Sequence, residues 1–199
     1  AAIDAYRTAL RLRPNYPEAY YNLGITLKQQ GNLIAAIESY KTALQLKPNY
    51  PEAHINIGNA LKEKGRLKGA ISSYKKAIQI KPDSVVAHIN LGLTLQNQGD
   101  IAKAITSFKT ALHLKHDCIE AYNHLGNAQQ QNGDLKAAIA TYKKALKLKS
   151  DYVEVHNNLG LALQMQGNLK AAVASYKKAL QPKPNYPEAL YNLGLALQM

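Results

Sequence analysis

The chain has 199 residues, a hydrophobic content of 46% and a formal net charge of +12. That hydrophobic content is typical of a folded protein, and no apolar run approaches the ~18 residues that a membrane-spanning helix requires. The single cysteine, Cys118, cannot form an internal disulfide, so we expect a reducing compartment, the cytoplasm. The positive charge raises the question of an acidic or nucleic-acid partner, and the answer depends on where the charges lie.

Along the chain, one short pattern returns every 34 residues. Its landmark is a leucine–glycine pair, with isoleucine once in place of leucine: Leu23-Gly24, Ile57-Gly58, Leu91-Gly92, Leu125-Gly126, Leu159-Gly160 and Leu193-Gly194. An aromatic column has the same period: Tyr6, Tyr40, Tyr74, Phe108, Tyr142 and Tyr176. Self-similarity at a fixed period of this size predicts a solenoid of stacked units, not a globule around one core.

The repeats divide the chain in order. Residues 1–16 carry only the second half of the pattern, so we expect the second helix of a truncated repeat there. Residues 187–199 carry only the first half and should form a first helix. Because the chain starts and stops inside a repeat, we expect it to be a fragment. Full repeats lie between these ends, at 17–50, 51–84, 85–118, 119–152 and 153–186.

The repeat at 17–50 shows why each unit should hold two helices. Apolar residues three and four apart form one stripe over 19–27 and another over 33–44. Between them, Gly31 suits the left-handed conformation that ends a helix, and Asn32 suits the cap of the next one. No alternating strand pattern appears anywhere. The sequence therefore predicts an all-α array of helix pairs.

Two positions depart from this pattern. Arg66 stands in the capping slot that holds asparagine or aspartate in the other full repeats. Pro182 replaces a leucine or isoleucine near the end of a second helix. Proline removes a backbone donor and disfavours helical geometry at Gln181, so we expect this helix to end about a turn early.

The repeat resembles the tetratricopeptide repeat (TPR) family over the whole chain, with tyrosine for the usual tryptophan. The resemblance implies a right-handed superhelical solenoid of antiparallel helix pairs. In that family the first helix of each pair lines a concave groove and the second faces outward. The matching residues of one repeat are Tyr20, Leu23, Gly24, Leu27, Ala36, Tyr40, Ala43 and Pro48.

An asparagine column stands two residues before each glycine of the leucine–glycine pairs. Asparagine competes with the helix backbone for hydrogen bonds, so its recurrence in mid-helix asks for a reason. By the resemblance the column faces the groove, where amides suit the backbone of an extended peptide. The alternative is that the asparagines bond between neighbouring helices or descend from a duplicated ancestor. The peptide-binding candidates are Asn22, Asn56, Asn90, His124, Asn158 and Asn192, together with Asn59 and Asn127.

The repeats are also similar to the repeat region of the O-linked N-acetylglucosamine transferases, in which such a ladder holds extended substrates. No glycosyltransferase domain is present here, so this resemblance leaves the hypothesis of a substrate-recognition region of a larger enzyme. Other TPR domains grip a terminal carboxylate with basic groove residues. The corresponding slots include Tyr21, Ile55, Ile89, Asn123 and Asn157, and none is basic.

The positive charge gathers on the second helices, which the resemblance places on the convex side. A solvated outer face accounts for this placement. Binding of nucleic acid or an anionic surface is the alternative, because sequence-independent phosphate contacts need only such a stripe. The lysines are Lys41, Lys75, Lys76, Lys109, Lys143, Lys144, Lys177 and Lys178.

No catalytic or metal-binding arrangement is evident. His54, His88 and His156 share one slot in different repeats, and helix layers at ordinary packing distances hold them about 10 Å apart or more. That separation is too large for a shared zinc with bonds of ~2 Å. We therefore expect no enzyme activity and no cofactor, and a protein or peptide as the partner.

The two ends of the chain are complementary. An unpaired second helix at the start and an unpaired first helix at the end would leave apolar residues partly exposed. Residues 186–199 of one molecule followed by 1–15 of the next would complete nearly one repeat. We therefore expect head-to-tail association that does not close into a dimer, in a crystal or at high concentration.

Overall fold

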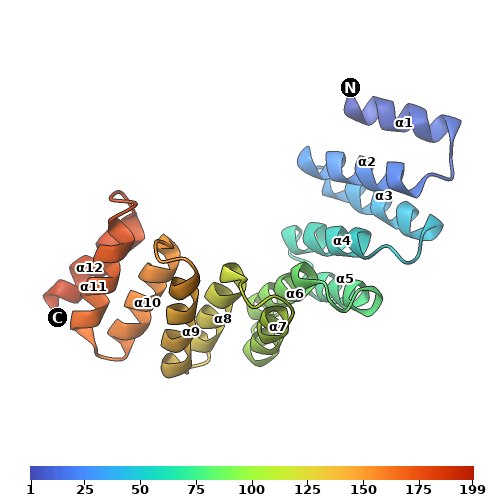
Figure 1. The fold of residues 1–199 in the computed structure, drawn as a ribbon. Helices are drawn as coiled ribbons and strands as arrows, with labels where there is room; N and C mark the ends of the chain where they lie inside the picture. Colours follow the sequence, from blue (N-terminus) through green and yellow to red (C-terminus); the bar gives the residue numbers. More distant parts are fainter. The chain divides into compact units, whose positions relative to one another are not determined.

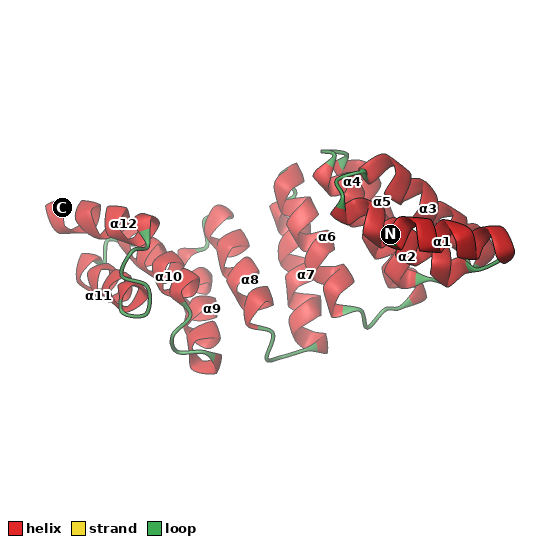
Figure 2. Ribbon diagram, turned by 90° about the horizontal axis from the view of Figure 1, so that it is seen from above, coloured by secondary structure: helices red, strands yellow, loops and turns green.

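The computed structural model describes all 199 residues, which form helices and connecting loops without any strand (Figure 2). None of the helices is long and apolar enough to cross a membrane. The chain divides into two compact units, Ala1–Gly99 with α1 to α6 and Asp100–Met199 with α7 to α12 (Figure 1). The helices are α1 Ala2–Leu12, α2 Pro17–Gln29, α3 Leu33–Leu46, α4 Pro51–Glu63, α5 Leu67–Ile80, α6 Val85–Gln98, α7 Ile101–Leu114, α8 Ile119–Gln131, α9 Leu135–Leu148, α10 Val153–Met165, α11 Leu169–Leu180 and α12 Pro187–Gln198.

Even-numbered helices are the first helices of the pairs, and odd-numbered helices are the second. In unit 1, α2 and α4 pack on the second helices before and after them in the chain, and α6 packs on α5. Unit 2 has the same order of contacts from α7 to α12. The predicted all-α array of consecutively packed helix pairs is confirmed.

Each unit curves in a direction set by its contacts. In unit 1, α2 contacts α4 and α4 contacts α6, whereas the second helices do not contact one another. In unit 2, α8 contacts α10 and α10 contacts α12, again with no contact between second helices. Elements on the inner side of a curve lie closer together, so the first helices form the inner face of each unit.

The helix ends follow the expected chemistry. Gly31, just beyond the C-cap of α2, has φ +78°, the left-handed conformation that glycine adopts without a steric penalty. The Oδ1 of Asn32 then accepts a 3.2 Å hydrogen bond from the Ala35 amide at the start of α3. Asp100, Asp134 and Asn168 cap in the same way, and Arg66 makes no side-chain cap.

The expectation at Pro182 was partly wrong. Helix α11 ends at Leu180, two residues before the equivalent ends of the other complete second helices, which is about half a turn. Gln181 has φ −60° and ψ −55°, so it stays helical, and its amide still bonds the Lys177 carbonyl at 3.2 Å. Proline disfavours helical geometry at the preceding residue without forbidding it, and the missing donor ends the helix at once.

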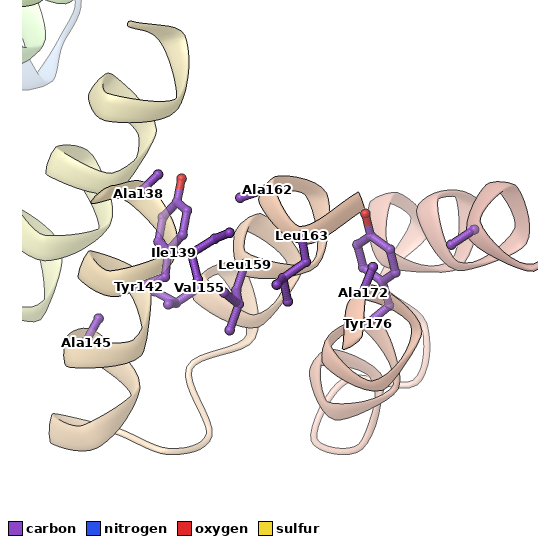
Figure 3. Close-up of a cluster of buried hydrophobic side chains, with 11 residues drawn as sticks. Ala138, Ile139, Tyr142, Ala145, Val155, Leu159, Ala162, Leu163, Ala172 and Tyr176 are labelled. Carbon is purple, nitrogen blue, oxygen red and sulfur yellow. The ribbon is translucent and has the colours of Figure 1, made fainter. Parts of the chain in front are cut away.

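The same close contact between a glycine of the first helix and a tyrosine ring of the second recurs in the core, and we call it the glycine–tyrosine lock. A Cβ added at Gly160 would lie 2.5 Å from Cε1 of Tyr176, so only glycine lets the ring lie against α10. In Figure 3 the rings of Tyr142 and Tyr176 flank α10, with Leu159 and Leu163 between them. The same lock holds Tyr40 and the other core tyrosines, and it fixes the distance between the helices of a pair.

Candidate functional site

The candidate residues of the sequence analysis all lie on first helices, hence on the inner faces of their units. Three ladder residues belong to unit 1, on α2, α4 and α6, and three to unit 2, on α8, α10 and α12. Every one of them is half-buried, so part of each side chain faces solvent: Asn22, Asn56, Asn90, His124, Asn158, Asn192, Asn59 and Asn127.

Three ladder asparagines bond to the first helix before their own. Nδ2 of Asn56 donates to the Tyr21 hydroxyl at 3.0 Å. Nδ2 of Asn158 donates to Oδ1 of Asn123 at 3.0 Å, and Nδ2 of Asn192 donates in the same way to its neighbour at 3.1 Å. These are the interhelical bonds that the sequence analysis left open as an alternative. They fasten adjacent first helices together on the inner face.

The acceptors of these bonds were missed as functional partners. Each lies 35 residues before its asparagine, in the slot that was tested only for basic residues. The polarity of that slot is the sequence signal that could have identified the acceptors. Tyr21, Asn123 and Asn157 can accept a hydrogen bond from the asparagine, whereas the Ile55 side chain cannot. Asn90 is therefore left without an acceptor on α4, and its side chain makes no hydrogen bond.

The side chain of Asn22 also makes no hydrogen bond, and its backbone carbonyl accepts one from Thr26. The slot 35 residues before Asn22 precedes residue 1, so this amide carries no argument. On the inner face of unit 1, Asn90 is the amide whose donors and acceptor are available to a ligand because its described slot, Ile55, offers no acceptor.

Asn59 and Asn127 bond to core tyrosines, and Asn127 also bonds to the next first helix. Oδ1 of Asn59 accepts from the Tyr74 hydroxyl at 2.7 Å, and Oδ1 of Asn127 accepts from the Tyr142 hydroxyl at 2.6 Å. Oδ1 of Asn127 also accepts from Nδ2 of Asn158 at 3.1 Å. The Nδ2 groups of Asn59 and Asn127 make no hydrogen bond and stay available on the inner face.

An aromatic cluster adjoins the tied amide of unit 1. The rings of Tyr21 and Tyr50 lie 4.8 Å apart between centroids, and the Lys47 ammonium lies 4.6 Å from the centre of the Tyr50 ring. Burial raises the pKa of Tyr50 to about 12 and also raises the pKa of Tyr21. Both phenols therefore stay protonated and neutral near pH 7.

The histidines do not converge. His88 and His156 place Nε2 at 3.0 and 2.7 Å from the backbone carbonyls of Pro82 and Ser150. The His124 ring stacks on Phe108 with centroids 5.7 Å apart. No group of three histidine, cysteine, aspartate or glutamate residues gathers where it could hold a metal ion.

The lysines of the second helices are all exposed, as expected for an outer face. Among the eight candidate lysines only Lys41 forms an ion pair, with Glu38 at 2.9 Å; Lys103 on α7, outside that set, pairs with Asp100. The exposed set is Lys41, Lys75, Lys76, Lys109, Lys143, Lys144, Lys177 and Lys178.

Comparison with known families decides what this array is. The model of the TPR repeat matches six consecutive segments, at residues 1–31, 26–65, 58–99, 97–133, 131–167 and 165–199. The chain belongs to the TPR repeat family. Its architecture is therefore that of a TPR scaffold for protein–protein interaction. No curated protein sequence matches the chain.

Solved structures of TPR proteins are similar to this chain. A crystal structure of MamA has 28% sequence identity and a TM-score of 0.76, over 83% of this chain and 90% of MamA. YrrB, described as a TPR protein with an unusual peptide-binding site, has 22% identity and a TM-score of 0.78, over 96% of this chain and 98% of YrrB. The pilF protein of Pseudomonas aeruginosa has 21% identity and a TM-score of 0.78, over 92% and 84% of the two chains.

Proposed function

We propose that this TPR array binds an extended peptide segment on the inner face of its first helices. The observation that carries the proposal is the amide of Asn90 in unit 1, whose side chain has no hydrogen-bond partner on the preceding first helix. An amide with free donors and a free acceptor can bond a peptide backbone whatever the peptide's side chains are.

The surroundings of Asn90 suit such a ligand. Ile55 and Ile89 occupy the slots beside the ladder and are half-buried, so apolar surface adjoins the amide. Binding sites for flexible ligands combine apolar surface with a few placed polar groups. A peptide backbone would bond the amide, and an apolar side chain of the peptide would cover the isoleucines.

Asparagines that already bond a neighbouring first helix would contact the ligand through their remaining polar atom, Oδ1. Each interhelical bond uses Nδ2 and leaves Oδ1 of Asn56, Asn158 and Asn192 without a partner. Such an oxygen can accept a bond from a backbone N–H of the peptide. The bond to the neighbouring helix also holds the amide in one orientation, which lowers the entropy lost on binding.

A displayed library of random peptides, selected on this chain, supplies a probe. A selected peptide titrated into the Asn90→Ala variant should bind about three- to tenfold more weakly, the effect of one lost hydrogen bond. Gln79→Ala is the matched control, because Gln79 is an exposed amide on the second helix α5. Equal affinity for Asn90→Ala and the unmodified chain would contradict the proposal.

The exposed lysines support a second candidate function, binding of nucleic acid or an anionic surface. Seven of the eight lack an ion pair, so their charge is available to phosphate groups. A salt series with random-sequence single-stranded RNA tests this function. Phosphate binding falls steeply between low and moderate salt, and substitution of Lys143 and Lys144 should weaken it while leaving peptide binding unchanged.

The resemblance to the repeats of glycosyltransferases gives a further alternative within the same mode of binding. If this array belongs to a larger enzyme, the peptide on its inner face is that enzyme's substrate. The Asn90→Ala variant of the larger protein would then raise KM for long peptides more than for short ones that reach only the catalytic domain.

A further inference from the structure

A cavity of about 250 Å³ opens in unit 1 between the second helix α3 and the next first helix α4, and we call it the α3–α4 cavity. Its apolar lining comes from Ile34 and Ile37 of α3 and from Ile57 and Leu61 of α4. None of the ladder asparagines lines it. Pockets for drug-sized ligands measure about 300–1,000 Å³, so this cavity suits one apolar side chain of a larger partner.

Ile34 is the exposed wall of the α3–α4 cavity. Its side chain is 65% exposed, whereas Ile37 is 8% exposed. The packing of second helices does not require a large apolar residue at this position, because the equivalent residues are Lys68, Ala102, Lys136 and Lys170. A single exposed apolar residue needs no partner, but Ile34 adjoins a cavity whose other walls are also apolar.

The turn after α4 makes the rim of the α3–α4 cavity basic. Lys64 and Arg66 line the cavity, and neither side chain forms an ion pair or a hydrogen bond. Lys41 also lines it, but Glu38 balances that charge at 2.9 Å. Two cations are therefore available to a negatively charged partner.

Neither cation is required by the repeat. The residues equivalent to Lys64 are Gln30, Gln98, Asn132 and Gln166, and those equivalent to Arg66 are Asn32, Asp100, Asp134 and Asn168. Arg66 also leaves α5 without the side-chain cap that the other complete second helices have. Three departures from the repeat thus line one cavity, and one of them removes a stabilising contact.

We propose that the α3–α4 cavity docks an acidic segment of a partner protein. One leucine, isoleucine or phenylalanine of the segment enters the cavity and covers Ile34 and Leu61. A neighbouring aspartate or glutamate pairs with Lys64 and Arg66, because a guanidinium matches the geometry of a carboxylate. This arrangement has the usual anatomy of a protein interface, an apolar anchor within a polar rim. The cavity shares no residue with the proposed inner-face site, so the two sites can bind different segments.

Selection from a displayed library of random peptides tests the proposal when it includes a counter-selection. Peptides that bind the unmodified chain are depleted on a variant with both Ile34→Lys and Arg66→Asn. Other repeats carry lysine and asparagine at these positions, so the variant should keep the fold. The remaining peptides should be enriched in a large apolar residue next to aspartate or glutamate. An empty pool, or a pool without acidic residues, would overturn the proposal.

Fluorescence anisotropy with one remaining peptide then measures the role of each residue. Ile34→Lys should weaken binding about tenfold, because it removes the apolar wall. Lys64→Gln and Arg66→Asn should each weaken it about two- to fivefold, the effect of one exposed ion pair. Lys75→Gln is the control, because it removes the same charge from an exposed position on α5 outside the cavity.

Two outcomes of this titration would overturn the proposal. Equal losses for Lys64→Gln and Lys75→Gln would indicate a general attraction between opposite charges. Weakening by Asn90→Ala but not by Ile34→Lys would place the peptide on the inner face. Under the proposal Asn90→Ala binds this peptide as the unmodified chain does, so failure of the cavity site and failure of the inner-face site are distinguishable.

Discussion

The hydroxyl of Tyr74 donates a 2.7 Å hydrogen bond to Oδ1 of Asn59 on the first helix of its own pair. Tyr40 holds the same position one repeat earlier and is just as fully buried. Ile25 stands there in place of the asparagine, and the Tyr40 hydroxyl has no partner. Two identical side chains in one unit thus differ by a single acceptor.

We expect opposite effects when these two hydroxyls are removed. Tyr74→Phe should lower the free energy of unfolding by about 1 kcal/mol, the net value of a hydrogen bond. Tyr40→Phe should leave it unchanged or raise it by about 1 kcal/mol, because a buried group without a partner destabilises the native state. Urea denaturation followed by circular dichroism measures both. In a double-mutant cycle, Ile25→Asn should be more favourable in the unmodified chain than in the Tyr40→Phe variant, which lacks the hydroxyl.

The glycine–tyrosine lock predicts a contrast between two glycines on first helices of unit 2. Gly160→Ala should destabilise the fold by about 1–3 kcal/mol, because its Cβ overlaps the fully buried Tyr176 ring. Gly194→Ala should raise helix stability by up to about 1 kcal/mol, because nothing lies near that Cβ. Thermal unfolding at low protein concentration compares the two. Equal losses at both positions would show that helix geometry, not the ring, requires glycine.

The capping slot of α5 offers a stabilising change. Arg66 makes no cap, whereas Asn32 caps α3 in the preceding repeat. Arg66→Asn should raise the free energy of unfolding by about 1 kcal/mol, and Asn32→Ala should lower it by a similar amount. Denaturation midpoints of the two variants test this. A fall in the midpoint of Arg66→Asn would mean that Arg66 has a stabilising role other than capping.

Burial of tyrosines predicts a loss of stability at high pH. The pKa values of Tyr50 and Tyr176 are raised by burial to about 12, from an ordinary 10.0. Their contribution to stability is therefore complete below pH 10 and is lost as the pH rises from 10 toward 12. In a pH titration, the phenolate absorbance of the native chain should rise at a higher pH than that of the chain in denaturant. Coincident titration curves would contradict the raised pKa values.

The repeat made most of the fold predictable. The fixed spacing of leucine–glycine pairs located the helices. Equivalent first helices pack against equivalent neighbours and therefore need the same residue types at the same positions. The residue types at Gly31 and Asn32 located the turns for a local reason, backbone conformation and capping. Pro182 was harder, because the residue before a proline balances a local steric preference against the packing of the helix, and here Gln181 stayed helical.

The ladder was visible in the sequence, but its internal bonds were not. The residue that ties Asn158 is Asn123, which precedes it by 35 positions, one more than the repeat length. This offset follows from the lateral shift of adjacent first helices, a property of packing that the repeat alone does not reveal. At the same offset from Asn90 stands Ile55, which has no acceptor in its side chain, and the Asn90 side chain makes no hydrogen bond.

The Asn90 amide on the inner face should bond a peptide backbone directly. The most direct measurement follows the side-chain amide signals of the ¹⁵N-labelled chain by NMR during titration with a selected peptide. The Asn90 side-chain signals should shift with the titration, and the Gln79 signal should stay in place. Peptide binding that moves signals of the second helices and leaves Asn90 unchanged would contradict the proposed role of Asn90.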